Sequence, residues 1–252
     1  LAILSQSTNT RQFNSYLRDS DISSAGIIID GEAYTQPCYT RYGNYPFCRW
    51  MRNGAYSVTK SLGASLAMMR LAQKYDSSVY ELKIKDYVDV TASHDGWENV
   101  TFSNVLNMAT GVGNNGTTLN SGDIFADENT AKMESWLVRS SLSEKLQLSF
   151  SYRNYAWDPG EEFRYNSAMT IVLAAAMENY YKSIEGEHAD FWQMMRDEVF
   201  SPIKIQHVPI LSTTEASDKP GLPELFHGLY PNIDDLTKLT NLLQNGGMHN
   251  GV

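Results

Sequence analysis

The chain has 252 residues, of which 42% are hydrophobic and 19% charged, ordinary values for a globular protein long enough to bury a sizeable core. Its formal net charge of −9, with scattered Lys and Arg, excludes a basic stripe that could displace counterions from nucleic acid. The longest apolar run, residues 171–177, is far shorter than the roughly 18 residues that span a bilayer, so we expect no membrane span.

The first part of the chain predicts a polar segment followed by a β-hairpin. Residues 1–24 are polar, and residues 10–17 are expected to form a short surface helix. Residues 25–34 contain two apolar runs joined by Asp30-Gly31, a pair that favours the tight turn of a hairpin. The continuous isoleucine run at 27–29 predicts burial on both faces, as in a central sheet.

The two cysteines, Cys38 and Cys48, flank a turn-rich excursion at residues 39–47. Their spacing matches no metal-binding motif. A disulfide could close this loop, which would favour a periplasmic or extracellular protein. The alternative is a pair of free thiols in a cytoplasmic protein, and the sequence leaves both open.

A long helix with an apolar stripe is predicted to begin near Ser57 and to end near Lys74. Its apolar residues recur at helical spacing and predict a buried, central helix: Leu62, Leu66, Met69 and Leu71. Ser57 and Lys60 are three residues apart, so one helical turn places the hydroxyl and the amine on the same face. A serine nucleophile with a lysine base requires this spacing. The lysine can accept the serine proton only when it is neutral, and burial near a helix N-terminus disfavours its charged form.

Other patterns in the chain favour structural roles. A second Ser-x-x-Lys, at residues 201–204, follows a predicted helix and contains Pro202, which marks a loop. Ser65 approximates the nucleophile elbow Gly-x-Ser-x-Gly, but it lies in mid-helix and the final glycine is missing. The Gly-x-Gly-x-x-Gly at residues 111–116 follows a helix rather than a strand and does not indicate a dinucleotide site. We therefore expect neither a cofactor nor a metal ion.

The remainder of the chain is predicted to be mostly helical, with no clear strand pattern between residues 75 and 158. In one of these helices, Trp136 and Leu137 are expected to point inward. Apolar periodicity and capping residues predict helices at 102–109, capped by Thr101, at 130–139, 168–181 and 191–200, and from Asn232 through Leu236, Leu239 and Leu243 to Gly246-Gly247.

Ordered motifs extend the pattern around Ser57. Residues 56–61, Tyr-Ser-Val-Thr-Lys-Ser, are followed by Leu-Asn-Met-Ala-Thr-Gly at 106–111 and by Pro-Gly-Glu-Glu-Phe-Arg-Tyr-Asn-Ser at 159–167. Gly-Leu-Tyr at 228–230 precedes the last helix. In this order the blocks resemble the penicillin-recognising serine hydrolases, the superfamily of class C β-lactamases, DD-peptidases and related esterases. The resemblance runs from about residue 27 to the end.

This resemblance implies an α/β (α+β) fold of the β-lactamase/transpeptidase type, with a central, mainly antiparallel sheet flanked by helices. Residues 1–252 would form a single domain, in which roughly residues 76–158 belong to a helical insertion. The expected late strands are not recognisable in the sequence. We therefore expect that a longer natural chain, or a second chain, supplies these strands.

The resemblance also implies a catalytic mechanism. Ser57 would attack an ester or amide, including a β-lactam or a D-amino-acid peptide, and form an acyl-enzyme. Lys60 and Tyr165 would share the proton transfers, and which of them is the base stays open because their titrations would be coupled. Asn166 or Ser167 would orient the substrate or Lys60. The expected partner is a small-molecule ester or amide.

Two departures from the family pattern affect the expected substrate. Ser167 stands where the second motif, Tyr-x-Asn, usually has its amide, which favours an esterase or peptidase over a true β-lactamase. The third motif, Lys-Thr-Gly or His-x-Gly, has only weak candidates at residues 219–221 and 249–251. The alternatives are an acyltransferase and a catalytically silent binding or sensor protein on the same scaffold.

Overall fold

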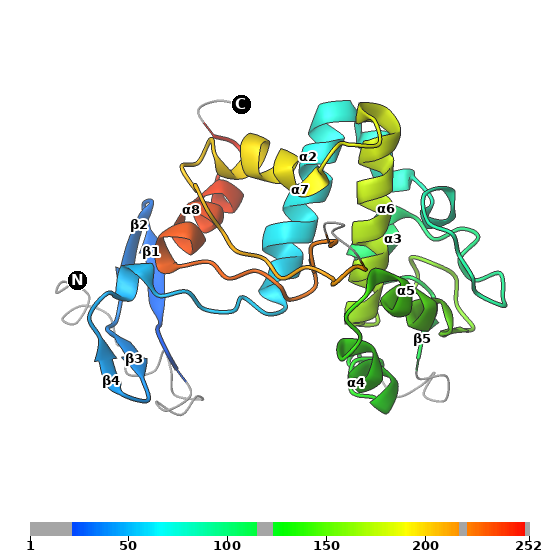
Figure 1. Ribbon diagram of the computed structural model, residues 1–252, viewed down its shortest axis with the longest axis horizontal. Coiled ribbons are helices and arrows are strands. Elements are labelled where there is room, and N and C mark those ends of the chain that lie inside the picture. The colour runs from blue at the N-terminus through cyan, green and yellow to red at the C-terminus, as the bar shows by residue number, and fades with distance from the viewer. Residues whose placement is uncertain (1–21, 115–122, 217–220, 250–252) are drawn as a thin grey trace. The chain divides into compact units, whose positions relative to one another are not determined.

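The computed structural model describes residues 22–114, 123–216 and 221–249 (Figure 1). These residues belong to two compact units. The first combines the chain up to Asn53 with Pro202–Val208 and the segment from Tyr230 onward. The second comprises Gly54–Ser201 and Pro209–Leu229, and it includes all of the expected helical insertion. The surface helix expected at residues 10–17 lies outside the described residues.

The first unit contains the predicted hairpin. Strands β1 (Gly26–Ile29) and β2 (Glu32–Thr35) pair antiparallel, with Ile27 opposite Tyr34. Asp30 and Gly31 form the turn with φ values of 51° and 81°, the left-handed conformation that a tight hairpin turn needs. The expected burial of the isoleucine run on both faces is wrong, because β1 pairs only with β2 among the described residues and Ile29 is 44% exposed.

A disulfide and an arginine tie the first unit together. Strands β3 (Cys38–Thr40) and β4 (Gly43–Tyr45) form a second hairpin, which precedes the short helix η3 (Cys48–Trp50). The Cys38–Cys48 disulfide is present, with Cα atoms 5.3 Å apart. The Arg52 guanidinium contacts Asp235 Oδ2 at 3.0 Å and donates to the carbonyls of Tyr230 and His207, each at 2.9 Å, so it joins the three segments of this unit.

Helix α8 (Ile233–Gln244) completes the first unit and begins at a capping box. Asn232 Oδ1 accepts the Asp235 N–H at 2.8 Å, and Asp235 Oδ2 accepts the Asn232 N–H at 3.1 Å. The predicted cap is therefore confirmed. Leu239 is buried as expected, whereas Leu243 is 37% exposed and Leu242 takes the inward position.

The second unit is built around helix α6 (Ser167–Glu185), which is apolar on most sides. Helices α3 (Phe102–Leu106) and α5 (Leu142–Phe150) pack against it. A π-helical stretch, η4 (Lys60–Ser65), also contacts α6 and continues directly into α2 (Leu66–Tyr75) (Figure 1). The remaining elements are η5 (Ser77–Glu81), η6 (Ile84–Asp86), β5 (Val112–Gly113), α4 (Ala131–Leu137), β6 (Arg153–Asn154), α7 (Phe191–Met195) and π-helical η7 (Arg196–Phe200).

All the helices predicted within the described residues are present, but two more inward positions are wrong besides Leu243. Met69 is 47% exposed while Met68 is fully buried. The π-helical stretch before α2 has a wider turn than an α-helix, so it rotates the buried stripe away from the position that ideal periodicity predicts. Leu137 is 46% exposed because it lies at the C-terminal end of α4, and only Trp136 points inward.

Besides the short 3₁₀ helices η5 and η6, the sequence did not predict one α-helix and two strands of the second unit. Helix α5 carries a capping box between Ser141 and Glu144, a signal that was readable in the sequence. Strands β5 and β6 have two residues each and pair antiparallel, too short for any periodicity. Among the described residues, no helix combines the length and the apolar character that crossing a membrane requires.

The disulfide provides a test of the first unit. Replacing Cys38 and Cys48 together with alanine should lower the free energy of unfolding by about 2–3 kcal/mol, because the unfolded loop regains conformational freedom. Urea denaturation followed by circular dichroism measures this. Wild-type protein under reducing conditions should behave like the double variant. Rapid alkylation of two thiols in native, unreduced protein would contradict the bridge.

Candidate active site

The segment around Ser57 is a tight turn that leads into the π-helical stretch. Tyr56 has a left-handed φ of 45°, an uncommon conformation for a residue with a Cβ. The N–H groups of Val58, Thr59 and Lys60 then bond to carbonyls three residues back, at 3.0, 2.9 and 3.0 Å. Ser57 thus stands at the entrance of the helix, where the positive end of the helix dipole lies.

A second contact fixes this turn to a distant part of the same unit. The Ala55 N–H donates to the Leu229 carbonyl at 2.8 Å, and the Leu229 N–H donates to Thr59 Oγ1 at 3.2 Å. Thr59 is fully buried. The Gly-Leu-Tyr block at 228–230, found in the sequence only by resemblance, therefore holds the approach to Ser57.

Lys60 is 9% exposed, and four oxygen atoms surround its amine. Its Nζ lies 3.2 Å from Ser57 Oγ and 2.8 Å from the Tyr165 hydroxyl. It also lies 2.9 Å from Ser167 Oγ and 2.9 Å from the Phe226 carbonyl oxygen. The chain thus brings groups from widely separated positions onto one amine.

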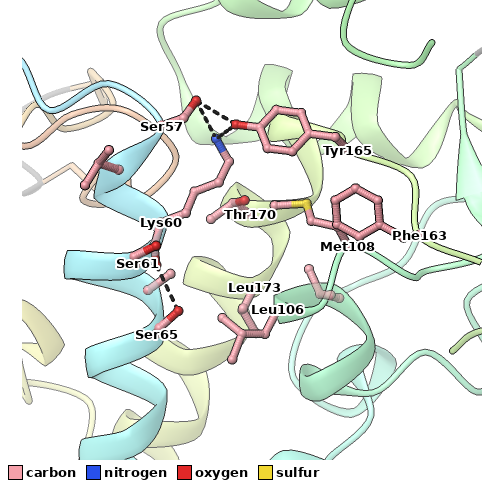
Figure 2. A pocket seen from close by; sticks show the side chains of 13 residues that line it. Ser57, Lys60, Ser61, Ser65, Leu106, Met108, Phe163, Tyr165, Thr170 and Leu173 are labelled. Carbon is pink, nitrogen blue, oxygen red and sulfur yellow. Dashed lines mark hydrogen bonds between the residues drawn. The ribbon is translucent and has the colours of Figure 1, made fainter. Parts of the chain in front are cut away.

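Tyr165 completes a triangle with Ser57 and Lys60, because its hydroxyl donates to Ser57 Oγ at 2.6 Å (Figure 2). The backbone around Tyr165 is fixed on both sides. Its own N–H donates to the Ile124 carbonyl at 2.8 Å, and the Arg164 N–H donates to the Met108 carbonyl at 2.7 Å. The hydroxyl is therefore held in place by main-chain contacts as well as by its partners.

The turn after α3 supports the segment that carries Tyr165. The Ala109 carbonyl accepts the Gly160 N–H at 2.7 Å, and the Gly111 carbonyl accepts the Tyr155 N–H at 2.9 Å. Gly111 has a φ of 70°, and a Cβ there would lie 3.0 Å from the Trp157 carbonyl oxygen. Glycine is required here because both the conformation and the space exclude a side chain.

The structure separates the roles of Asn166 and Ser167. Asn166 is 1% exposed, and its Oδ1 accepts the Ala168 N–H at 3.0 Å, so it caps α6. Ser167 contacts Lys60 directly and also contacts Glu128. Its hydroxyl donates to Glu128 Oε1 at 2.7 Å, and its N–H donates to Glu128 Oε2 at 2.8 Å.

Sequence analysis did not identify Glu128 or the Phe226 carbonyl as parts of this site. Neither belongs to a motif with a recognisable spacing, and a main-chain carbonyl leaves no trace in side-chain identity. For the third motif, residues 219, 220, 250 and 251 lie outside the described residues. The structure therefore leaves both third-motif candidates untested.

A buried charged cluster lies next to the Phe226 carbonyl. Lys145 is 1% exposed, and its Nζ lies 3.5 Å from Glu224 Oε1 and 4.2 Å from the centroid of the Trp136 ring. Burial lowers the pKa of Lys145, and Glu224 opposes that shift. The imidazole of His227 stacks on Phe226 with ring centroids 4.1 Å apart. Burial lowers the pKa of His227 as well, Glu224 opposes that shift, and the two nearby lysines, Lys145 and Lys60, add to it.

A pocket of about 360 Å³ lies beside Ser57, and its wall is mainly apolar (Figure 2). Ser57, Lys60 and Tyr165 belong to its lining. Apolar side chains from α3, the following turn, the second-motif segment and α6 form much of the rest: Val105, Leu106, Met108, Phe163 and Leu173. Among the described residues, no group of His, Cys, Asp and Glu could hold a metal ion.

Comparison with known protein families shows to which family the chain belongs. The family model described as Beta-lactamase matches residues 51–247, a range that includes every group of the Ser57 site. The chain belongs to this family. The resemblance read from the motifs and the α/β fold class are therefore confirmed. No curated protein sequence matches the chain.

Solved structures agree with this fold at low sequence identity. The penicillin binding protein from Bacillus halodurans has a TM-score of 0.61 at 20% identity, over 90% of this chain and 71% of its own. The octameric penicillin-binding protein homologue from Pyrococcus abyssi has a TM-score of 0.63 at 16% identity, over 91% of this chain and 54% of its own. A D-stereospecific amidohydrolase from Streptomyces sp. has a TM-score of 0.57 at 13% identity, over 88% of this chain and 68% of its own. The family fold thus extends across the described residues, while this chain spans only part of each protein.

The pKa of His227 depends on the charge of Lys60 and can therefore be used to test the electrostatics of the site. The pKa of His227 should lie below 6.5, and Lys60→Met should raise it, because Lys60 contributes to lowering it. Because the pKa of His227 is lower in the folded protein than in the unfolded chain, the unfolded chain binds the imidazole proton at a higher pH than the folded protein does. The free energy of unfolding should therefore decrease below about pH 6.5, and His227→Gln should weaken that decrease.

NMR titration of the imidazole measures this pKa, and Lys83→Met serves as a control with a lysine outside the site, whose Nζ bonds Asn99. A pKa of His227 at or above 6.5 in the wild-type protein would contradict the prediction.

Proposed function

We propose that the chain is a serine hydrolase that acts on ester or amide substrates through an acyl-enzyme at Ser57. The observation that carries this proposal is the triangle of Ser57, Lys60 and Tyr165, with separations of 2.6, 2.8 and 3.2 Å. A nucleophile within hydrogen-bond reach of a base, with that base oriented by further groups, is the arrangement that activates a serine hydroxyl.

In the proposed reaction, Ser57 Oγ forms a bond to the substrate carbonyl carbon while its proton moves to the Lys60–Tyr165 pair. The same pair returns a proton to the departing alcohol or amine when the ester or amide bond breaks. Water then attacks the acyl-enzyme by the reverse sequence and restores the Ser57 hydroxyl.

The Ser57 N–H at the helix entrance is the proposed first donor to the negatively charged oxygen of the tetrahedral intermediate. The apolar pocket wall beside Ser57 favours substrates that carry an apolar group next to the reacting carbonyl. The named activity of the Streptomyces amidohydrolase is in keeping with amide substrates. An exported location is proposed on the Cys38–Cys48 bridge, because disulfides persist in oxidising compartments.

A fluorophosphonate should label Ser57 and no other serine. Ser57 is the hydroxyl that receives the Tyr165 hydrogen bond and lies one helical turn from Lys60. Mass spectrometry of proteolytic fragments locates the adduct, and Ser57→Ala should abolish it. An adduct on Ser65 or Ser201 instead would overturn the assignment.

A burst experiment with p-nitrophenyl acetate separates the proposal from its alternatives. A hydrolase releases one equivalent of p-nitrophenol rapidly and then turns over steadily. An acyltransferase gives the burst but needs an added alcohol or amine for fast turnover. A catalytically silent binding protein gives no burst.

Replacing Tyr165 with phenylalanine should lower turnover by about 10²- to 10⁴-fold, because the ring packing stays while the proton-transferring hydroxyl is lost. The rate of p-nitrophenyl acetate hydrolysis and the thermal unfolding midpoint are measured together. Tyr56→Phe is the matched control, since Tyr56 is adjacent to Ser57 but 73% exposed. Equal activity in the Tyr165 variant and the wild type would show that Tyr165 is structural.

A further inference from the structure

We infer that Glu128 is a positioning residue that acts through the Ser167 hydroxyl and fixes the direction in which Lys60 can accept a proton. The inference rests on the proposed function, because it concerns the proton-accepting state of Lys60. Its starting point is the two-pronged contact in which one carboxylate receives both the hydroxyl and the N–H of Ser167, at 2.7 and 2.8 Å.

A carboxylate has no hydrogen to donate, so Glu128 determines where the Ser167 hydroxyl proton points. A serine hydroxyl carries one proton and two lone pairs. Since the proton is directed at Glu128, the Oγ of Ser167 can only accept a hydrogen bond from Lys60, whose Nζ is 2.9 Å away. Without the carboxylate, the hydroxyl could rotate and donate to Lys60 instead.

The Phe226 carbonyl imposes the same condition from another direction, because a carbonyl oxygen can only accept. A neutral lysine amine has two N–H bonds and one lone pair. With the N–H bonds directed at Ser167 and Phe226, the lone pair is left for the Ser57 hydroxyl at 3.2 Å, whose oxygen accepts the Tyr165 hydroxyl proton at 2.6 Å. This is the orientation that a base at Lys60 needs.

The loop that carries Glu128 is fixed to the segment that carries Tyr165. The neighbouring Asp127 is fully buried, and its carboxylate accepts the Asn114 N–H at 3.0 Å and pairs with Arg164 Nε at 3.5 Å. The Asn114 side-chain amide donates to the Asp127 carbonyl at 2.8 Å. Glu128 and Tyr165 are therefore held by contacts between the same two segments, since the Tyr165 N–H also donates to the Ile124 carbonyl at 2.8 Å.

Ser167 occupies the place where the resembling motif has an amide, and a hydroxyl alone is a poor substitute. An amide oxygen accepts without rotating, whereas a hydroxyl can either donate or accept. Glu128 removes this ambiguity. The pair of Ser167 and Glu128 thus supplies Lys60 with an acceptor of fixed direction.

The test is a double-mutant cycle on the rate constant of Ser57 acylation by p-nitrophenyl acetate. Glu128→Gln introduces an N–H donor that can reverse the Ser167 hydroxyl and draw the Lys60 lone pair away. We expect a loss of about 10- to 100-fold in this rate constant, typical of an outer hydrogen-bond partner, with little change in KM. Ser167→Ala should cause a loss of similar size.

The double variant decides how Glu128 acts. If Glu128 works through the hydroxyl, adding Glu128→Gln to Ser167→Ala should cause no further loss. Ser167→Ala keeps the backbone N–H that bonds Glu128, so a purely structural role of Glu128 would still cost activity in that background. Multiplicative losses would overturn the inference. Glu134→Gln, on the exposed face of α4, is the control and should match the wild type.

Other outcomes are also decisive. A wild-type protein that p-nitrophenyl acetate does not acylate refutes the proposed function and this inference with it. An acylated wild type with multiplicative losses refutes only the inference. If Glu128→Gln shows no thermal unfolding transition, Glu128→Asp replaces it, because the shorter carboxylate should lose its reach to the hydroxyl with the same dependence on Ser167.

Discussion

The burial of the Lys60 amine is the constraint on which the Ser57 site depends. A buried polar group that lacks hydrogen-bond partners is costly, so each direction around Nζ must be occupied by an acceptor or a hydroxyl. Those partners come from the helix entrance, from the start of α6 and from the turn at Phe226. The second unit therefore has to bring distant segments together before the amine can leave water, and the same contacts place Ser57 beside it.

This requirement explains the supporting turns. The turn after α3 holds the segment of Tyr165, and Leu229 holds the turn of Ser57, both through main-chain hydrogen bonds. Neither contact touches Ser57 Oγ or Lys60 Nζ. Their function is to limit the distance between the hydroxyls and the amine, which decides whether a proton can move between them.

The sequence predicted the parts of the site that repeat at fixed local spacing. Ser57 and Lys60 are neighbours on one helical turn, and Tyr165 lies in an ordered motif that only the family pattern made readable. Glu128 was not predictable in this way, because it meets Ser167 across 39 positions of the chain, and the Phe226 carbonyl meets Lys60 across 166. Pairings of that length are fixed by tertiary packing. The prediction for Ile29 failed for a related reason, since an apolar run does not show what will cover it. The prediction for Met69 failed because the π-helical stretch before α2 shifts the buried face.

The two acceptors of the Lys60 N–H bonds, the Phe226 carbonyl and the Ser167 hydroxyl, differ in how an amino-acid substitution affects them. The Phe226 contact uses a main-chain oxygen, so substitutions at that position leave the acceptor itself in place. The Ser167 contact depends on two side chains, and a change at either one alters the other's role. Position 226 can therefore change without loss of this contact, whereas a change at 128 or 167 alters the acceptor that Lys60 meets. An asparagine at 167 would accept from Lys60 through its amide oxygen, so position 128 would no longer matter to the amine.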